Sequence, residues 1–127
     1  MTNADGVKGG ALVTDGAGNV SFKGTRTQTT ASTVSLAINV DNIDASFVTA
    51  LAVDIDIPEP TGTPHEMQII NIRLFDDGTP RLITFNAVFV GFGSALPTTT
   101  TVGKTLLISA MYNAVTGKYE TLNALEQ

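Results

Sequence analysis

The stretch LPTTTTVGKTLLISAMYNAVTGKYETL, residues 96–122, places four threonines ahead of two apolar-rich runs that a tight turn separates. The turn segment VTG joins KTLLISAMYNA to KYETLNALE, and a short glycine-containing loop between two β-prone runs is typical of a β-hairpin. The β-branched residues 98–101 suit an extended connection, and Pro97 restricts the chain at its start. We therefore expect the last third of the chain to be a connection followed by a hairpin.

Two runs in the first half of the chain alternate between apolar and polar residues, TVSLAINV at 33–40 and LAVDIDI at 51–57. Alternation with a period of two predicts half-buried strands. Apolar residues of the overlapping segment 44–53 also recur at helical spacing, so a helical turn or two there is an alternative. The predicted inward residues are Val34, Leu36, Ile38 and Val40 in the first run, and Leu51, Val53, Ile55 and Ile57 in the second.

Turn-forming residues divide the rest of the chain into further short strands. Residues 12–22, LVTDGAGNVSF, predict a small hairpin, and DDGT at 76–79 predicts a second one between the runs 67–75 and 81–93. The segment PEPTGTP at 58–64 has three prolines and predicts a rigid loop, while GFGS at 91–94 predicts a bend, a bulge or a turn. Many short strands with regular turns predict an all-β, antiparallel β-sandwich of the jelly-roll type.

The composition indicates one domain that associates with other protein. The chain has 127 residues, of which 43% are hydrophobic and only 15% charged. We expect a flexible arm at residues 1–10 and a single β-sandwich domain at 11–127. Because an isolated small domain normally carries more charge, part of the surface is expected to be covered, and we predict self-association.

The net charge of −5 argues against nucleic acid or an anionic membrane as a partner, because both repel an acidic surface. Cysteine is absent from the sequence, which excludes disulfides and thiolate metal sites. We expect no cofactor.

The few candidate catalytic residues each have a more ordinary interpretation. His65 is the only histidine of the chain and is expected to be a solvated loop residue rather than a base or ligand. Asp54 and Asp56 share one strand face, where a carboxylate pair could serve acid–base chemistry. Alternation places both on the solvated side, so we interpret them as guards against edge-to-edge sheet pairing, with cation binding as a minor alternative.

Two binding functions remain open at the sequence level. Oxygen-rich loop residues offer ligands of the kind that Ca²⁺ takes, although their spacing is not that of an EF-hand. Exposed Tyr side chains could stack on sugars. We assign no catalytic, cofactor or metal residue; the calcium candidates are Asp15, Asn19, Asp41, Asn42 and Asp44, and the sugar candidates are Tyr112 and Tyr119.

Residues 72–127 resemble small β domains found in structural proteins of tailed bacteriophages. Those domains share the order I-R-x-x-D-x-G-T-x-R-x-I-T-x-N, then L-P-T-T-T, then K-T-L and Y-N. The last strand of related domains often carries Trp, where this chain has Tyr119. The matching positions are Ile72, Arg73, Asp76, Gly78, Thr79, Arg81, Ile83, Thr84 and Asn86, then 96–100, then Lys104, Thr105, Leu106, Tyr112 and Asn113.

This resemblance implies a non-enzymatic virion component, usually trimeric, on the outer capsid or at a fibre. A fibre needs a shaft, and the sequence shows neither heptads nor extended repeats, so we favour a capsid decoration (cement) or head-fibre protein bound to the major capsid protein or other virion proteins. The alternatives are a tail-fibre or receptor-binding module for a host-surface glycan and, less favoured, a non-viral binding module or enzyme. The arm is the expected capsid attachment, through Thr2, Asn3, Ala4, Asp5, Gly6, Val7 and Lys8.

Overall fold

The computed structural model describes the backbone of residues 11–14 and 20–23 and the whole of residues 26–125. These ranges contain ten strands and no helix, which confirms the expected all-β class. No helix of the described residues is therefore available to cross a membrane. The strands are β1 (Ala11–Thr14), β2 (Val20–Lys23), β3 (Thr27–Thr30), β4 (Ala45–Leu51), β5 (Ile55–Ile57), β6 (Ile69–Asp76), β7 (Ile83–Phe85), β8 (Phe89–Gly91), β9 (Leu106–Asn113) and β10 (Lys118–Leu125).

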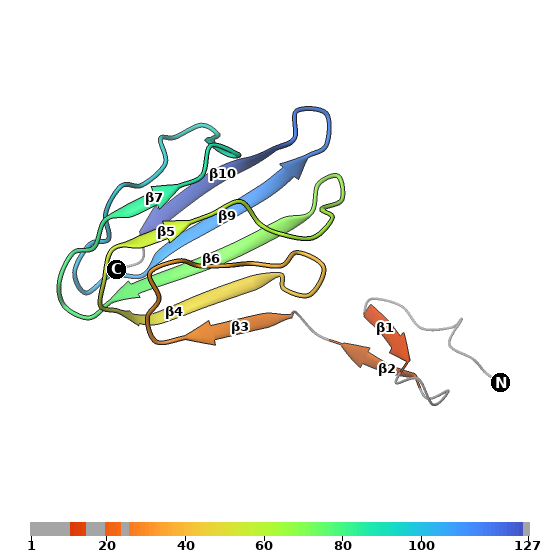
Figure 1. Ribbon diagram of the computed structural model, residues 1–127, viewed down its shortest axis with the longest axis horizontal. Coiled ribbons are helices and arrows are strands. Elements are labelled where there is room, and N and C mark those ends of the chain that lie inside the picture. The colour runs from red at the N-terminus through yellow and green to blue at the C-terminus, as the bar shows by residue number, and fades with distance from the viewer. Residues whose placement is uncertain (1–10, 15–19, 24–25, 126–127) are drawn as a thin grey trace.

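Most strands belong to one six-stranded sheet, in the order β3-β4-β6-β9-β10-β8. A two-stranded sheet of β5 and β7 lies in front of it in Figure 1. Strands β1 and β2 pair with each other as an antiparallel hairpin, as the sequence predicts. The predicted C-terminal hairpin is also confirmed, because β9 and β10 pair antiparallel along their whole length.

The expectation of antiparallel sheets is wrong for four strand pairs. Strand β3 is parallel to β4, β4 to β6, β8 to β10, and β5 to β7. Parallel neighbours need a crossover connection, and two of these pairs, β4 with β6 and β5 with β7, are connected through a strand of the other sheet. After β4, for example, the chain forms β5 in the smaller sheet before it returns as β6.

The predicted hairpin between residues 67–75 and 81–93 is wrong for the same reason. Strand β6 pairs with β4 and β9, whereas β7 pairs with β5 in the other sheet. The DDGT segment therefore connects two sheets rather than two neighbouring strands. The GFGS segment is a bend, as one of the expected options, and a Cβ at Gly91 would overlap the backbone oxygen of Ser94.

The structure agrees only in part with the prediction for the two alternating runs. The run at 33–40 is extended but makes only isolated bridges, Ser35 to Asp56 and Asn39 to Thr61. The run at 51–57 is divided, because Leu51 ends β4 and Ile55 begins β5. The helical alternative at 44–53 is wrong, since β4 occupies it. Leu36, Ile38, Val40, Leu51, Ile55 and Ile57 are buried as predicted, whereas Val34 and Val53 are exposed.

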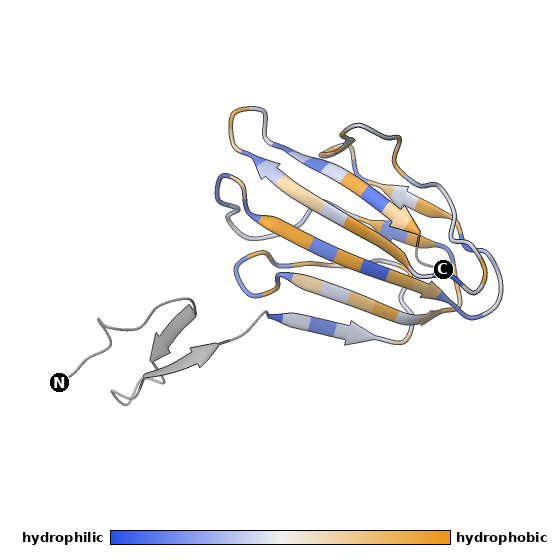
Figure 2. Cartoon of the chain, turned by 180° about the vertical axis from the view of Figure 1, so that it is seen from behind, coloured by the Kyte–Doolittle hydropathy of each residue, from blue (hydrophilic) through white to orange (hydrophobic). Residues whose placement is uncertain are grey.

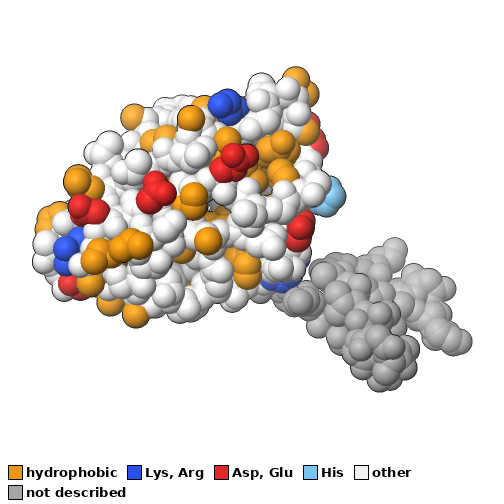
Figure 3. All heavy atoms as spheres, viewed as in Figure 1, with side chains coloured by type: hydrophobic (Ala, Val, Ile, Leu, Met, Phe, Trp, Pro, Cys, Tyr) orange, Lys and Arg blue, Asp and Glu red, His pale blue; other side chains and the backbone are white. Residues whose placement is uncertain are grey.

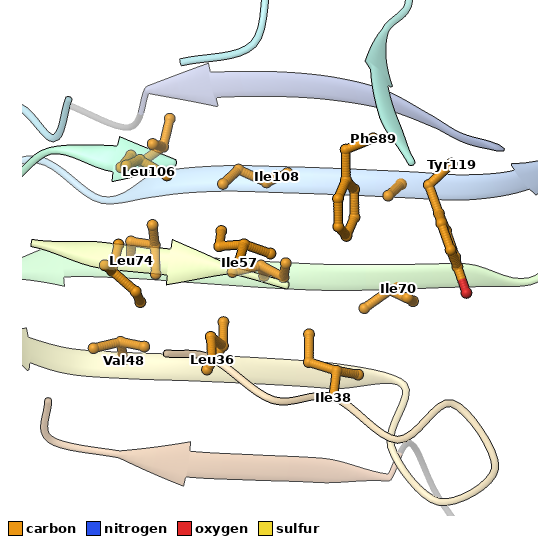
Figure 4. Packing of buried hydrophobic residues seen from close by; sticks show 14 of the residues in the cluster. Leu36, Ile38, Val48, Ile57, Ile70, Leu74, Phe89, Leu106, Ile108 and Tyr119 are labelled. Carbon is orange, nitrogen blue, oxygen red and sulfur yellow. The ribbon is translucent and has the colours of Figure 1, made fainter. Parts of the chain in front are cut away.

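The hydrophobic core lies between the two layers. Ile70, Ile72 and Leu74 of β6 and Ile108 of β9 are fully buried on the face of the large sheet that meets Ile57 of β5. Figure 4 shows the labelled members of this set converging with Leu36 and Ile38. Each fully buried side chain of this size stabilises the fold by about 1.5–3 kcal/mol relative to its exposed state. The smaller layer therefore covers one face of the six-stranded sheet and leaves the other uncovered by the described chain.

Candidate functional site: the outer face of the six-stranded sheet

We define the outer face as the side of the six-stranded sheet that points away from β5 and β7. The paired registers place on it the odd-numbered residues 45–49 of β4, 69–75 of β6 and 107–113 of β9, and the even-numbered residues 118–124 of β10. Figure 2 views the molecule from this side. Apolar side chains on it are well exposed, with Ile69 at 41%, Leu107 at 43% and Leu122 at 53%.

A shallow groove of about 220 Å³ crosses the outer face over β3, β4 and β6. Phe47 of β4 lies beside Arg73 of β6, which is its partner in the paired register. The Arg73 guanidinium carbon lies 5.2 Å from the Phe47 ring centroid, a cation–π contact. Asn71 and the threonines of β3 add polar groups to the lining. The groove thus combines an aromatic side chain, a cation and hydrogen-bonding groups.

Residues around the DDGT segment hydrogen-bond to the neighbouring connection at Thr100. Asp76 is buried, and its Oδ1 accepts a hydrogen bond from the Gly78 N–H at 3.1 Å. The Arg81 N–H donates to Thr100 Oγ1 at 2.9 Å, and Arg81 O accepts from the Thr100 N–H. Thr100 itself is buried. These residues therefore stabilise the scaffold around the DDGT segment.

The Arg81 side chain also fixes the turn electrostatically. Its Nη2 lies 3.0 Å from both carboxylate oxygens of Asp77. This hydrogen bonding lowers the pKa of Asp77 below its ordinary value of 3.8. Asp76 Oδ2 and Arg81 Nε, in contrast, are buried atoms without a hydrogen-bond partner among the described residues. Unsatisfied buried polar atoms cost stability.

His65 is exposed, in agreement with its interpretation as a solvated loop residue. Figure 3 shows its side chain projecting at the edge of the molecule. Its backbone N–H donates to Gln68 Oε1 at 2.9 Å. The neighbouring Met67 has a positive φ of 63°, which is uncommon for a residue other than glycine, and its side chain is exposed beside the outer face.

Asp54 and Asp56 are exposed as predicted, but they do not guard a sheet edge. Strand β5 pairs with β7 on one side. On the other side the Asp56 backbone exchanges hydrogen bonds of 2.9 Å with Val34 and Leu36. Asp54 Oδ1 accepts from the Leu82 N–H and so ties the smaller sheet together. The edge-guard interpretation is wrong, because a strand flanked on both sides has no free edge.

Of the described calcium candidates, Asp41 and Asp44 have protein partners, and Asn42 is exposed in a turn. Asp44 binds Arg26, with Nη2 to Oδ1 at 2.7 Å and Nε to Oδ2 at 3.1 Å. This pairing raises the pKa of Arg26, and its Nη1 also donates to the Asp41 carbonyl. Asp41 Oδ1 accepts from the Thr63 N–H at 3.0 Å. Within residues 26–125, no group of three His, Asp or Glu residues is arranged to hold a metal, and Asp15 and Asn19 lie outside the described residues.

The two tyrosines belong to an aromatic cluster on the inner side of the large sheet. Tyr119 is 3% exposed and stacks on Phe89 at 5.3 Å between ring centroids, with Tyr112 at 5.1 Å. Burial, with smaller effects of Tyr112 and Glu59, raises the pKa of Tyr119 from its ordinary value of 10.0 to about 12. Tyr119 is therefore a core residue rather than a platform for a sugar.

Two contacts between segments that are distant in the sequence could not be predicted from it. The Arg26–Asp44 ion pair and the Phe47–Arg73 contact both depend on parallel pairing of β3, β4 and β6, for which no local signal exists. Exposed apolar residues in β9 did have a signal, the unbroken run LLI at 106–108. The predicted attachment residues Thr2 to Lys8 lie outside the described residues.

Compared with protein-family models, curated proteins and solved structures, the chain shows a significant match to none.

Proposed function

We propose that the protein is a non-enzymatic structural component of a tailed-phage virion, a trimeric capsid decoration or head-fibre protein bound to the outer capsid. The observation that carries this proposal is the outer face, on which Ile69, Leu107 and Leu122 are exposed although their strands are central to the fold. Apolar sheet faces of this kind are contact surfaces for other protein. In this proposal the two layers form a jelly-roll-like β-sandwich that acts through shape and packing.

The resemblance to phage structural domains supports the same proposal. Two pairs of its residues are hydrogen-bonded near the DDGT segment, Asp76 with Gly78 and Arg81 with Thr100. Such residues maintain a scaffold, as expected for a motif shared among structural proteins. The function then resides in the surfaces that the scaffold presents.

Capsid attachment is assigned to the arm at residues 1–10, and a truncation tests it. Deletion of residues 2–10 is expected to leave the melting temperature within a few degrees, because their glycine-rich polar sequence can bury little apolar surface. Capture by purified capsids of the encoding phage should weaken about tenfold or more, which corresponds to about 1.4 kcal/mol. Equal capsid binding by both forms would remove the arm from the proposal, and failure of the full chain to bind capsids would contradict the capsid location.

The groove beside Phe47 and Arg73 favours a second candidate, a tail-fibre or receptor-binding module for a host-surface glycan. Its aromatic ring, its cation and Asn71 are the group types that contact sugars, acidic ones in particular. Titration with neutral and acidic oligosaccharides separates the two functions. Saturable binding that Arg73→Ala abolishes would favour the glycan module, whereas capsid binding without glycan binding would favour decoration.

A further inference from the structure

Strand β9 has the sequence of a strand that is covered on both faces. Its inner residues Leu106, Ile108 and Ala110 are buried in the core. Its outer residues include Leu107 and Met111, so the run LLISAM has no regular polar alternation. A sheet with one solvated face normally alternates apolar and polar residues, and near-continuous apolar strands occur where both faces are covered. The described chain covers only one of them.

The dimensions of the outer face suit an interface between folded proteins. Four long strands, β4, β6, β9 and β10, form its centre. With strands about 4.8 Å apart and a rise of about 3.3 Å per residue, they span about 500 Å² in flat projection. Two such faces bury about 1,000 Å², which reaches the size required for a specific interface.

The charges on the outer face are arranged for contact with a second copy. Arg73 lies on β6 and Glu120 on β10, on opposite sides of β9. The register places Arg73 level with Leu107 and Glu120 level with Met111, so the two charges are diagonal across Ser109. A second copy can be placed by rotation about an axis that runs parallel to the face, above Ser109 and at right angles to the line from Arg73 to Glu120. This rotation brings Arg73 of one copy toward Glu120 of the next.

The surroundings of these two side chains fit this pairing. Arg73 has no ion pair among the described residues, and its contact with Phe47 keeps the guanidinium close to the sheet. Glu120 Oε2 accepts one hydrogen bond, from Asn113 Nδ2 at 3.1 Å, which orients the carboxylate. A face that presents both signs of charge around an apolar centre is complementary to itself.

We propose that the outer face is the contact between copies of this chain, with Arg73 of one copy against Glu120 of the next and the outer residues of β9 between them. This inference rests on the self-association in the proposed function but not on the virion location or on the number of copies. It also places the groove beside Phe47 inside the assembly, where a large glycan has no access.

A pair of matched substitutions tests the surface. Leu107→Glu introduces a charge on the outer face, and Leu82→Glu introduces the same charge at an exposed position of the other layer. Light scattering at equal concentrations should show that Leu107→Glu reduces the assembly to single chains while Leu82→Glu retains it. Circular dichroism verifies that both variants keep their strands. A folded Leu107→Glu variant that still assembles would overturn the proposal.

A charge exchange tests the pairing. Arg73→Glu and Glu120→Arg should each raise the concentration of half-dissociation about tenfold or more, because like charges then oppose each other. The double variant should restore most of the affinity, and Asp56→Arg on the smaller layer should have no effect. A double variant no tighter than the single ones would contradict the pairing. Assembly through this face without capsid binding would leave the inference standing and remove only the virion location.

Discussion

The two faces of the six-stranded sheet are built from neighbouring residues of the same strands, yet they differ in what covers them. Ile108 is 0% exposed and Leu107 is 43% exposed, and the same contrast separates Ile70 from Ile69. On the inner face, segment 36–40 and β5 supply the covering side chains. On the outer face the described chain supplies none, although exposed apolar residues lie there among polar ones. Apolar residues in a strand thus indicate that a face is covered, and only the fold shows whether the same chain covers it.

The largest expected loss of stability comes from a substitution on the inner face. Ile108→Ala should lower the free energy of unfolding by about 2–5 kcal/mol, because it leaves a cavity in a closely packed core. Leu107→Ala should cost less than about 1 kcal/mol in dilute solution, where the outer face is solvated. Urea unfolding of the two variants measures both values. Equal losses in dilute solution would contradict the contrast between the faces.

A smaller effect is expected from one buried hydroxyl group. Thr100→Val keeps the side-chain volume but removes the acceptor of the Arg81 N–H, which should cost about 1–3 kcal/mol. Thr99→Val is the matched control, because Thr99 is exposed and should tolerate the change within about 0.5 kcal/mol. Thermal unfolding compares the two variants. A neutral Thr100→Val would show that this bond does not stabilise the turn.

The burial of Tyr119 on the inner face predicts a loss of stability at alkaline pH. The pKa of Tyr119 is raised from 10.0 to about 12, so its neutral form contributes stability that is complete below pH 10 and is lost as the pH rises through about 12. Tyr119→Phe keeps the ring but cannot ionise, and it should make stability less dependent on pH in this window. Near-ultraviolet titration of tyrosinate detects the high pKa directly. Titration of Tyr119 near 10 would contradict its burial.

The smallest effect is expected at His65, which is exposed in a loop. His65→Ala should change the free energy of unfolding by less than about 0.5 kcal/mol and leave assembly unchanged. Chemical unfolding and light scattering measure the two properties. A large loss would mean that His65 is ligated or covered in the assembly.

The sequence predicts which side of a strand is buried better than it predicts which strands pair. Alternation correctly identifies Leu36, Ile38 and Ile57 as buried, and turn chemistry correctly predicts the β9–β10 hairpin. Which strands pair cannot be read from a local pattern, because pairing depends on where crossovers place distant segments. The parallel pairs and the flanked position of β5 were missed for this reason. The low charge and the apolar run of β9 indicate that part of the surface is covered, but they do not show which part.

The most direct test of the central claim is the molecular mass of the full chain in solution, measured by light scattering over a dilution series. A mass about three times that of one chain is expected at about 50 μM, with dissociation on dilution, because assembly depends on concentration. A dimer that Leu107→Glu dissociates would support the outer face and correct the number of copies. A single-chain mass throughout the series would contradict the claim that other copies cover the outer face.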